Sequence, residues 1–205
     1  MSQLATVLLP PHINSATGIH RPGLDEVTTV IVPGWHGSGP DHWQRRWAAE
    51  LPRTRVVEQS DWEQPRPGDW VGTLERTIQA TSGVVVLVAH SLGCITVARW
   101  AREHDAERVA GALLVAPADV ERPRCPRALR NFAPIPRGRL PFPNLVVGSS
   151  NDPAASPERA AALTAGWGGR FLLLNGVGHI NVESGHHRWD EGRRMLEKWV
   201  QGLGA

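Results

Sequence analysis

The chain has 205 residues, of which 41 % are hydrophobic and 20 % charged, a composition typical of one soluble globular domain with a single sizeable core. A formal net charge of +2 is too small to indicate a nucleic-acid-binding surface, and Lys198 is the only lysine among the 22 basic residues. The longest apolar run, about that of VVVLVA, is far shorter than the roughly 20 residues that a membrane-spanning helix needs. We therefore expect neither a nucleic-acid partner nor a membrane partner.

The N-terminus and the cysteines bear on the cellular compartment. The opening MSQLATVLLPPH has no basic flank, and its apolar patch ends at Pro10 and Pro11, so it does not read as a secretory signal. Cys94 and Cys125 are the only cysteines, too few for a disulfide framework. These features predict a cytoplasmic protein.

Strand-like and helical patterns alternate along the chain. Several of the strand-like runs are apolar without alternation, as in parallel strands covered on both faces. Strands are expected at 27–32, 54–59, 83–89, 111–116, 145–149 and 170–175. Helices are expected after Gly39 with Pro40 in the opening turn, after Asp69 as N-cap, from Ser91, from Ser156 and from about His187 to Gln201. The alternation predicts a doubly wound α/β fold with helices on both faces of a mainly parallel sheet.

One long segment interrupts this alternation. Residues 121–143 hold six arginines and six prolines, too many prolines for a regular helix or a central strand. A solvated surface excursion is the simpler interpretation, and a specific anion site is the alternative.

The stretch VVVLVAHSLGC, residues 84–94, combines a buried strand with a serine at its end. Ser91 lies between the third strand and the third helix, at the sheet edge where ligands bind in doubly wound folds. Ala89 and Gly93 are small, as the close approach of strand and helix requires, so AHSLG fits the G-x-S-x-G nucleophile elbow with alanine in the first place. Ser91 could otherwise be an ordinary helix N-cap. In an elbow, the Leu92 amide faces the developing oxyanion.

A nucleophilic serine needs a base and an orienting acid. Of the nine histidines, His179 is the candidate base because it follows the last strand within the flexible GVGHIN. Asp152 follows the fifth strand in SSNDP, and the order Ser91, Asp152, His179 is that of α/β hydrolases. Asp119, after the fourth strand, is the alternative acid.

The glycine-rich VPGWHGSGPDHW follows the first strand. It lacks the spacing and the lysine of a phosphate-binding loop, so a turn that presents backbone N–H groups beside Ser91 fits better. We expect the Trp35 amide, or next the His36 amide, to complete the oxyanion hole. Trp35, His36 and His90 are the candidate substrate contacts, whereas Trp43 and Trp47 have helical spacing and are expected in the core.

Four collinear stretches resemble a known family. PGWHGSGPDHWQRRW, AHSLGC, PIP…LPFPNLVVGSSNDP and GVGHIN are similar to the small serine hydrolases of the retinoblastoma-binding protein nine (YdeN-like) type, over about residues 30–185. The resemblance implies a compact α/β hydrolase with six main strands in the order 2-1-3-4-5-6, no separate cap domain and a triad of Ser91, Asp152 and His179. Residues 1–25 have no counterpart and are expected to be an N-terminal extension to a single domain, residues 26–205.

These inferences predict a serine hydrolase that cleaves a small ester or amide through an acyl-enzyme. Ser91 is the predicted nucleophile, His179 the general base and Asp152 the orienting acid, and neither a metal nor an organic cofactor is required. The alternative is a hydrolase-like module that binds a protein partner, an interaction that the family resemblance alone suggests. Cys94, one turn into the third helix, is expected to be a small buried residue rather than a nucleophile.

Overall fold

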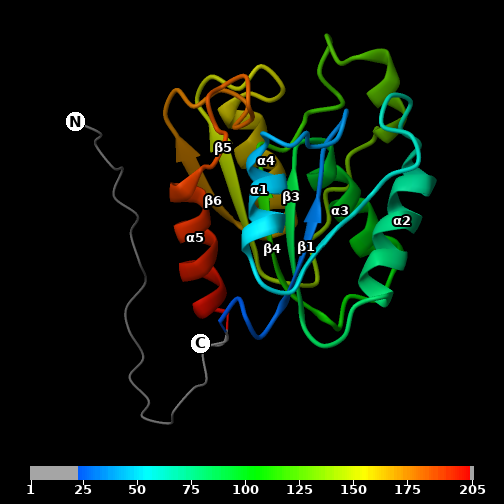
Figure 1. Cartoon of the computed structure of the whole chain (residues 1–205). Coiled ribbons are helices and arrows are strands. Elements are labelled where there is room, and N and C mark those ends of the chain that lie inside the picture. Colours follow the sequence, from blue (N-terminus) through cyan, green and yellow to red (C-terminus); the bar gives the residue numbers. More distant parts are fainter. Residues whose placement is uncertain (1–22, 204–205) are drawn as a thin grey trace.

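Six strands form one parallel sheet in this computed structural model, which describes residues 23–203. The strand order is β2-β1-β3-β4-β5-β6, as the family resemblance predicted (Figure 1). The strands are β1 (Thr28–Val32), β2 (Thr54–Val56), β3 (Val85–His90), β4 (Val109–Val115), β5 (Asn144–Ser149) and β6 (Arg170–Leu174). The helices are α1 (Trp43–Glu50), α2 (Pro67–Gln79), α3 (Leu92–Glu103), η1 (Arg127–Phe132, a 3-10 helix), α4 (Pro157–Trp167) and α5 (Asp190–Gln201). The predicted extension falls mostly on residues 1–22, outside the described residues.

Helices cover both faces of the sheet, which explains why the central strands are apolar throughout. Every residue of β1 and β3 is buried. Residues of α2, α3 and α4 pack on one face, with Trp70, Trp100 and Trp167 in the core cluster there. Residues of α1 and α5 pack on the other face (Figure 1). The sheet is therefore a rigid platform whose strands all end at the same edge.

Three helix starts differ from the sequence prediction. The segment 39–42 forms a turn, in which the His42 N–H donates to the Gly39 carbonyl, and α1 begins only at Trp43, with His42 as its N-cap. Helix α2 begins at Pro67, so Asp69 lies in its first turn and is not its N-cap. Helix α5 begins at Asp190, after Trp189 in a left-handed conformation. Proline at a first helical position and a left-handed residue both set boundaries that apolar spacing does not reveal.

The proline- and arginine-rich segment 121–143 is more buried than its composition predicts. As predicted, it holds neither an α-helix nor a strand, and η1 is its only helical turn. However, it contributes six side chains to the core cluster under α2 and α3, namely those of Cys125, Leu129, Phe132, Ile135, Leu140 and Phe142. The Arg99 guanidinium of α3 also donates to the carbonyls of Phe132 and Pro134. The interpretation of the segment as a solvated excursion is therefore wrong for these six apolar side chains, which are buried.

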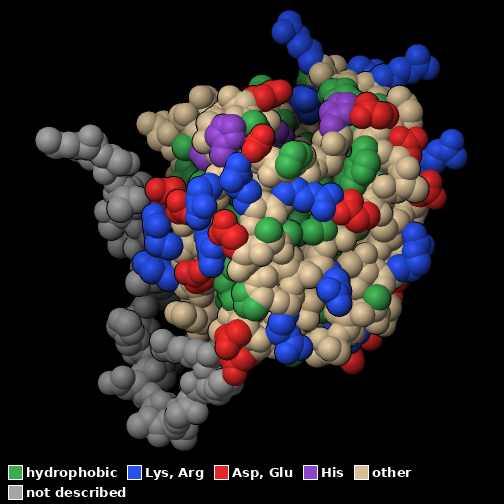
Figure 2. Space-filling view, viewed as in Figure 1, with side chains coloured by type: hydrophobic (Ala, Val, Ile, Leu, Met, Phe, Trp, Pro, Cys, Tyr) green, Lys and Arg blue, Asp and Glu red, His purple; other side chains and the backbone are tan. Residues whose placement is uncertain are grey.

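Acidic and basic side chains are interspersed on the face that α1 and α5 cover (Figure 2). Some of them are paired: the Arg193 guanidinium of α5 lies 2.7 Å from the Glu50 carboxylate of α1, and Arg46 of α1 lies 2.8 Å from Asp41 in the preceding turn. This face presents no extended field of one sign, in keeping with the small net charge. Within residues 23–203, no helix is long and apolar enough to cross a membrane.

Candidate active site

Ser91 occupies a strained turn between β3 and α3. Its backbone has φ 54° and ψ −121°, a positive-φ conformation that is uncommon for residues other than glycine. The turn is fixed by the Ser91 N–H, which donates to the Val115 carbonyl of the neighbouring β4. This is the predicted nucleophile-elbow geometry, which presents the serine hydroxyl at the carboxyl edge of the sheet.

The glycine two residues after Ser91 is required by contacts that the structure identifies. A Cβ on Gly93 would lie 2.3 Å from the Val32 carbonyl oxygen and 2.7 Å from that of Pro33. Glycine is therefore needed where α3 passes the end of β1, the neighbouring strand rather than the strand that carries Ser91. Ala89 is completely buried within β3.

His179 links Ser91 to Asp152. The His179 Nε2 lies 2.9 Å from Ser91 Oγ, and its Nδ1 lies 2.9 and 3.0 Å from the two carboxylate oxygens of Asp152. Because a carboxylate only accepts hydrogen bonds, Nδ1 carries the proton and Nε2 is left to accept the serine hydroxyl proton. The Asp152 side chain is only 3 % exposed, and it also accepts the Ala154 N–H at 2.7 Å.

Asp119, the alternative acid, is engaged elsewhere. One of its carboxylate oxygens lies 3.2 Å from Arg159 Nε and accepts the Glu121 N–H. Arg159 also forms an ion pair with Glu121. The Asp119 carboxylate thus joins the start of segment 121–143 to α4, and the carboxylate in contact with His179 is that of Asp152.

The loop between β1 and α1 lies directly against Ser91. A Cβ on Gly34 would be 2.7 Å from Ser91 Cβ, so the backbone of the loop passes beside the hydroxyl. The His36 N–H donates to the Trp62 carbonyl at 3.3 Å, whereas the Trp35 N–H has no acceptor among the described residues. Leu92 is the first residue of α3, where backbone N–H groups lack helical partners. Of the two loop amides considered, that of Trp35 is the one free to donate.

The two histidines predicted as substrate contacts lie in different environments. The His36 side chain is 52 % exposed, lies 2.9 Å from the Glu63 carboxylate and contacts the Trp35 ring, with centroids 3.9 Å apart. His90 is only 5 % exposed, and its Nε2 lies 2.9 Å from the His179 carbonyl oxygen. His90 is therefore buried in contact with the backbone of His179 rather than on an open surface, unlike His36.

Burial keeps the histidines around His179 neutral. Burial lowers the pKa of His90 well below its ordinary value, and the nearby His179 and His42 lower it further. Burial also lowers the pKa of His42 to about 4. The His90 ring lies between the other two, with ring centroids 5.0 Å from His42 and 4.9 Å from His179. Near pH 7, His179 therefore faces an uncharged neighbour.

Burial also accounts for Cys94. It raises the pKa of the Cys94 thiol beyond the physiological range, and the thiol donates to the Val115 carbonyl. A protonated, fully buried thiol is not a nucleophile. Cys94 is thus the small buried residue that the sequence predicted.

Gln44 is a buried polar residue that the sequence did not single out. Its side-chain amide donates to the carbonyls of Val32, the last residue of β1, and of Val88 within β3, and its oxygen accepts the Ser38 hydroxyl. It therefore ties the loop beside Ser91 to the sheet. In the sequence, a glutamine followed by two arginines indicates a solvent-facing helical position. Only its position next to Trp43 indicated that Gln44 could be buried.

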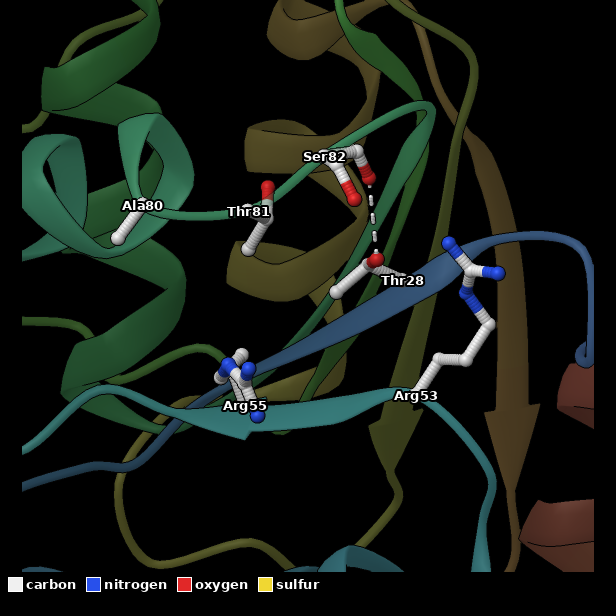
Figure 3. A pocket seen from close by; sticks show the side chains of 6 residues that line it. All are labelled: Thr28, Arg53, Arg55, Ala80, Thr81 and Ser82. Carbon is white, nitrogen blue, oxygen red and sulfur yellow. Dashed lines mark hydrogen bonds between the residues drawn. The ribbon is translucent and has the colours of Figure 1, made fainter.

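Several surface hollows are lined by residues other than Ser91, Asp152 and His179. One, of about 310 Å³, is at the opposite edge of the sheet, where the strands begin (Figure 3). Its lining has no histidine or carboxylate that could act as a base, and consists of Thr28, Arg53, Arg55, Ala80, Thr81 and Ser82. Across the described part of the chain, no three histidine, cysteine or acidic side chains gather as a metal site would require.

A six-stranded parallel sheet in this order, with an elbow serine in hydrogen-bond contact with a histidine, defines an α/β hydrolase. The chain belongs to the serine hydrolase family, whose family model matches residues 29–198. It is therefore a hydrolytic enzyme of the α/β-hydrolase superfamily, as predicted. No curated protein matches the sequence significantly.

Solved structures show the same architecture. A protein described as a YdeN-like hydrolase from Pectobacterium atrosepticum is 30 % identical, with a TM-score of 0.77 over 87 % of this chain and 92 % of that one. The ydeN gene product of B. subtilis is 20 % identical, with a TM-score of 0.71 over 84 % and 98 %. A thermophilic esterase from Thermogutta terrifontis is 15 % identical, with a TM-score of 0.63 over 87 % and 91 %. The last two likenesses concern the fold alone.

Proposed function

We propose that the protein cleaves a small ester or amide through an acyl-enzyme formed on Ser91. The observation that carries the proposal is the continuous hydrogen-bonded chain from Ser91 Oγ through His179 to the Asp152 carboxylate. In this arrangement Asp152 is the orienting acid, His179 the general base and Ser91 the nucleophile.

In the acylation step, Ser91 Oγ forms a bond to the carbonyl carbon while its proton passes to His179 Nε2. The electron pair of the carbonyl double bond moves to oxygen, and the Trp35 and Leu92 amides stabilise that oxyanion. Collapse of the intermediate expels the alkoxide or amine, which takes the proton from His179. Asp152 holds Nδ1–H throughout, so that the imidazolium formed between the two transfers is stabilised.

In deacylation, water replaces Ser91 as the nucleophile. His179 Nε2 takes a proton from water, the hydroxide attacks the acyl carbonyl, and the Ser91 oxygen leaves with that proton. The products are a carboxylic acid and an alcohol or amine. Every proton is carried by His179, so these steps call on the three side chains and the two amides alone.

The proposed substrate class is small because little protein is available to cover a long acyl chain. Among the described residues, the only connection between strands that contains no α-helix is the one between β4 and β5, and its apolar side chains already pack into the core. The rim near Ser91 therefore consists of short loops, including the one that carries Trp35 and His36.

An active-site-directed fluorophosphonate tests the proposal against the alternative of a protein-binding module. We expect covalent labelling of the wild-type protein, with the added mass located on the peptide that contains Ser91, and turnover of p-nitrophenyl acetate. The Ser91→Ala variant should bind no label and lose turnover, because its methyl group cannot form the phosphonate ester. A folded wild-type protein that remains unlabelled and inactive would favour the binding module.

A further inference from the structure

Three consecutive residues around His179 are each held by a side chain from a different part of the sheet edge. The Asn151 Oδ1, after β5, accepts the Gly178 N–H at 2.7 Å. The His90 Nε2–H, at the end of β3, donates to the His179 carbonyl at 2.9 Å. The Trp43 Nε1–H, at the start of α1, donates to the Ile180 carbonyl at 2.8 Å. We refer to Trp43, His90 and Asn151 as the loop clamp.

Two of the three clamp side chains are fixed by burial. Trp43 is completely buried against Trp47 and Trp189, and His90 is only 5 % exposed. The Asn151 oxygen is fixed instead by a second hydrogen bond, from the Ser149 hydroxyl at 2.8 Å. Each contact therefore ties the histidine loop to a side chain that has little freedom to move.

The loop needs such support because its backbone is unfavourable. Gly176, Gly178 and Ile180 have φ values of 70°, 60° and 50°. Glycine adopts this region freely, but for a β-branched residue such as isoleucine it is strained and persists only where surrounding contacts enforce it. Ile180 is completely buried, and its carbonyl is the one held by Trp43.

We propose that Trp43, His90 and Asn151 are positioning residues, which hold the backbone at 178–180 so that the His179 imidazole is aligned with both Ser91 and Asp152. The proposal rests on the proposed function, because it assigns these residues to the work of the catalytic histidine. They act on His179 through its backbone and do not contact the reacting atoms.

His90 suits this role because it is a hydrogen-bond donor that stays uncharged. Its Nε2 must carry the proton, since the carbonyl oxygen of His179 can only accept. During the reaction His179 becomes a cation, and a charged imidazole with its ring centroid 4.9 Å away would oppose that step. A neutral, buried His90 supports the backbone without this penalty.

Helix α1 offers a matched pair of substitutions that separates positioning from stability. Trp43 and Trp47 are both buried, and both donate an indole N–H to a carbonyl in the C-terminal part of the chain. The acceptor of Trp43 is Ile180, next to His179, whereas that of Trp47 is Arg188. Trp43→Phe and Trp47→Phe therefore remove comparable packing and one hydrogen bond each, but only the first loosens the histidine loop.

We would measure kcat and KM for p-nitrophenyl acetate, with active sites counted from the endpoint of fluorophosphonate labelling and Tm from circular dichroism. Per labelled site, Trp43→Phe should lower kcat about 10- to 100-fold with KM little changed, because misaligned catalytic groups lose turnover rather than binding. Trp47→Phe should lower Tm by a similar amount and keep kcat. Equal kcat values per site in the two variants would overturn the proposal.

A second pair tests the His90 donor directly. His90→Leu fills the space without an N–H and should lower kcat per site about 10-fold or more, whereas His90→Gln keeps an amide donor and should recover most of the loss. The downfield proton NMR resonance of the His179–Asp152 hydrogen bond should shift or broaden in His90→Leu and return in His90→Gln. An unchanged kcat and resonance in His90→Leu would refute the role of His90. If the wild-type protein is neither labelled nor active, the proposed function fails instead.

Discussion

At the scale of single residues, two aspartates compete for the role of orienting acid, and their surroundings separate them. Among the described residues, the hydrogen-bond partners of the Asp152 carboxylate are His179 Nδ1 and the Ala154 N–H, and its side chain is 3 % exposed. The Asp119 carboxylate is occupied by the Arg159 guanidinium and the Glu121 N–H. Asp152 holds the tautomer of the His179 imidazole, whereas Asp119 belongs to an ion-pair network that joins the start of segment 121–143 to α4.

We therefore expect Asp152→Asn to lower ester turnover by about 10⁴-fold with the fold intact, because an amide no longer fixes the imidazole tautomer. Asp119→Asn should keep most of the turnover and lower Tm, because Arg159 loses a buried partner. Kinetics on both variants, with circular dichroism to confirm folding, provides the measurement. The opposite ranking of the two turnover numbers would assign the acid to Asp119.

The sequence was sufficient to predict which side chains meet at this edge, but not what supports them. Ser91, Asp152 and His179 were predictable because each follows a recognisable strand and parallel strands end together. His90 and Gln44 were not, because their partners are backbone carbonyls distant in sequence: His90 contacts residue 179, and Gln44 contacts residues 32 and 88. Such contacts leave no periodic pattern in the sequence. A polar side chain that is buried therefore cannot be distinguished there from one that is exposed.

At the scale of elements, the site depends on how closely α3 approaches the end of β1. The six strands could be predicted because unbroken apolar runs mark strands buried on both faces, whereas their order was predicted from the family resemblance alone. The buried half of segment 121–143 could not, since its apolar residues are spaced by prolines and arginines and follow neither a helical nor a strand period. In the sequence, the only sign that α3 approaches β1 closely was the small residue Gly93, two positions after Ser91.

Gly93→Ala tests this approach. The added Cβ would lie 2.3 and 2.7 Å from carbonyl oxygens of Val32 and Pro33, which are backbone atoms and cannot rotate away. We expect a loss of about 1–3 kcal/mol in the free energy of unfolding, together with lower turnover per labelled site as the elbow is displaced. Urea unfolding measures the loss of stability. The p-nitrophenyl acetate assay, with active sites counted by fluorophosphonate labelling, measures the turnover per site.

Gly72→Ala in α2 is the matched control for Gly93→Ala. Its added Cβ would meet only the end of the flexible Arg76 side chain, at 3.3 Å, and alanine is favoured over glycine by about 1 kcal/mol inside a helix. We expect this variant to be at least as stable as the wild-type protein, with unchanged turnover. A Gly93→Ala protein as stable and active as the Gly72→Ala protein would show that α3 can move away from β1 without cost.

At the scale of the whole molecule, the buried histidines couple folding to pH. Folding lowers the pKa of His42 from its ordinary 6.5 to about 4, chiefly because burial disfavours the imidazolium and secondarily because His179 lies nearby. Burial shifts the pKa of His90 in the same direction. Between pH 6.5 and pH 4 the unfolded chain therefore binds more protons than the folded one, and its population rises as the pH falls. The stability that these groups contribute is fully present above pH 6.5 and is lost through this window.

For His42 alone, the shift from 6.5 to about 4 corresponds to a loss of about 2 kcal/mol between pH 7 and pH 5. Urea unfolding at the two pH values measures it. The informative variant is His42→Asn, because asparagine can still accept the Gln44 N–H that His42 Nδ1 caps, yet it does not titrate. We expect the stability of this variant to fall about 2 kcal/mol less than that of the wild-type protein between pH 7 and pH 5. An equal fall in both proteins would mean that His42 is protonated in the folded state, and that the acid sensitivity arises from His90 or from other groups.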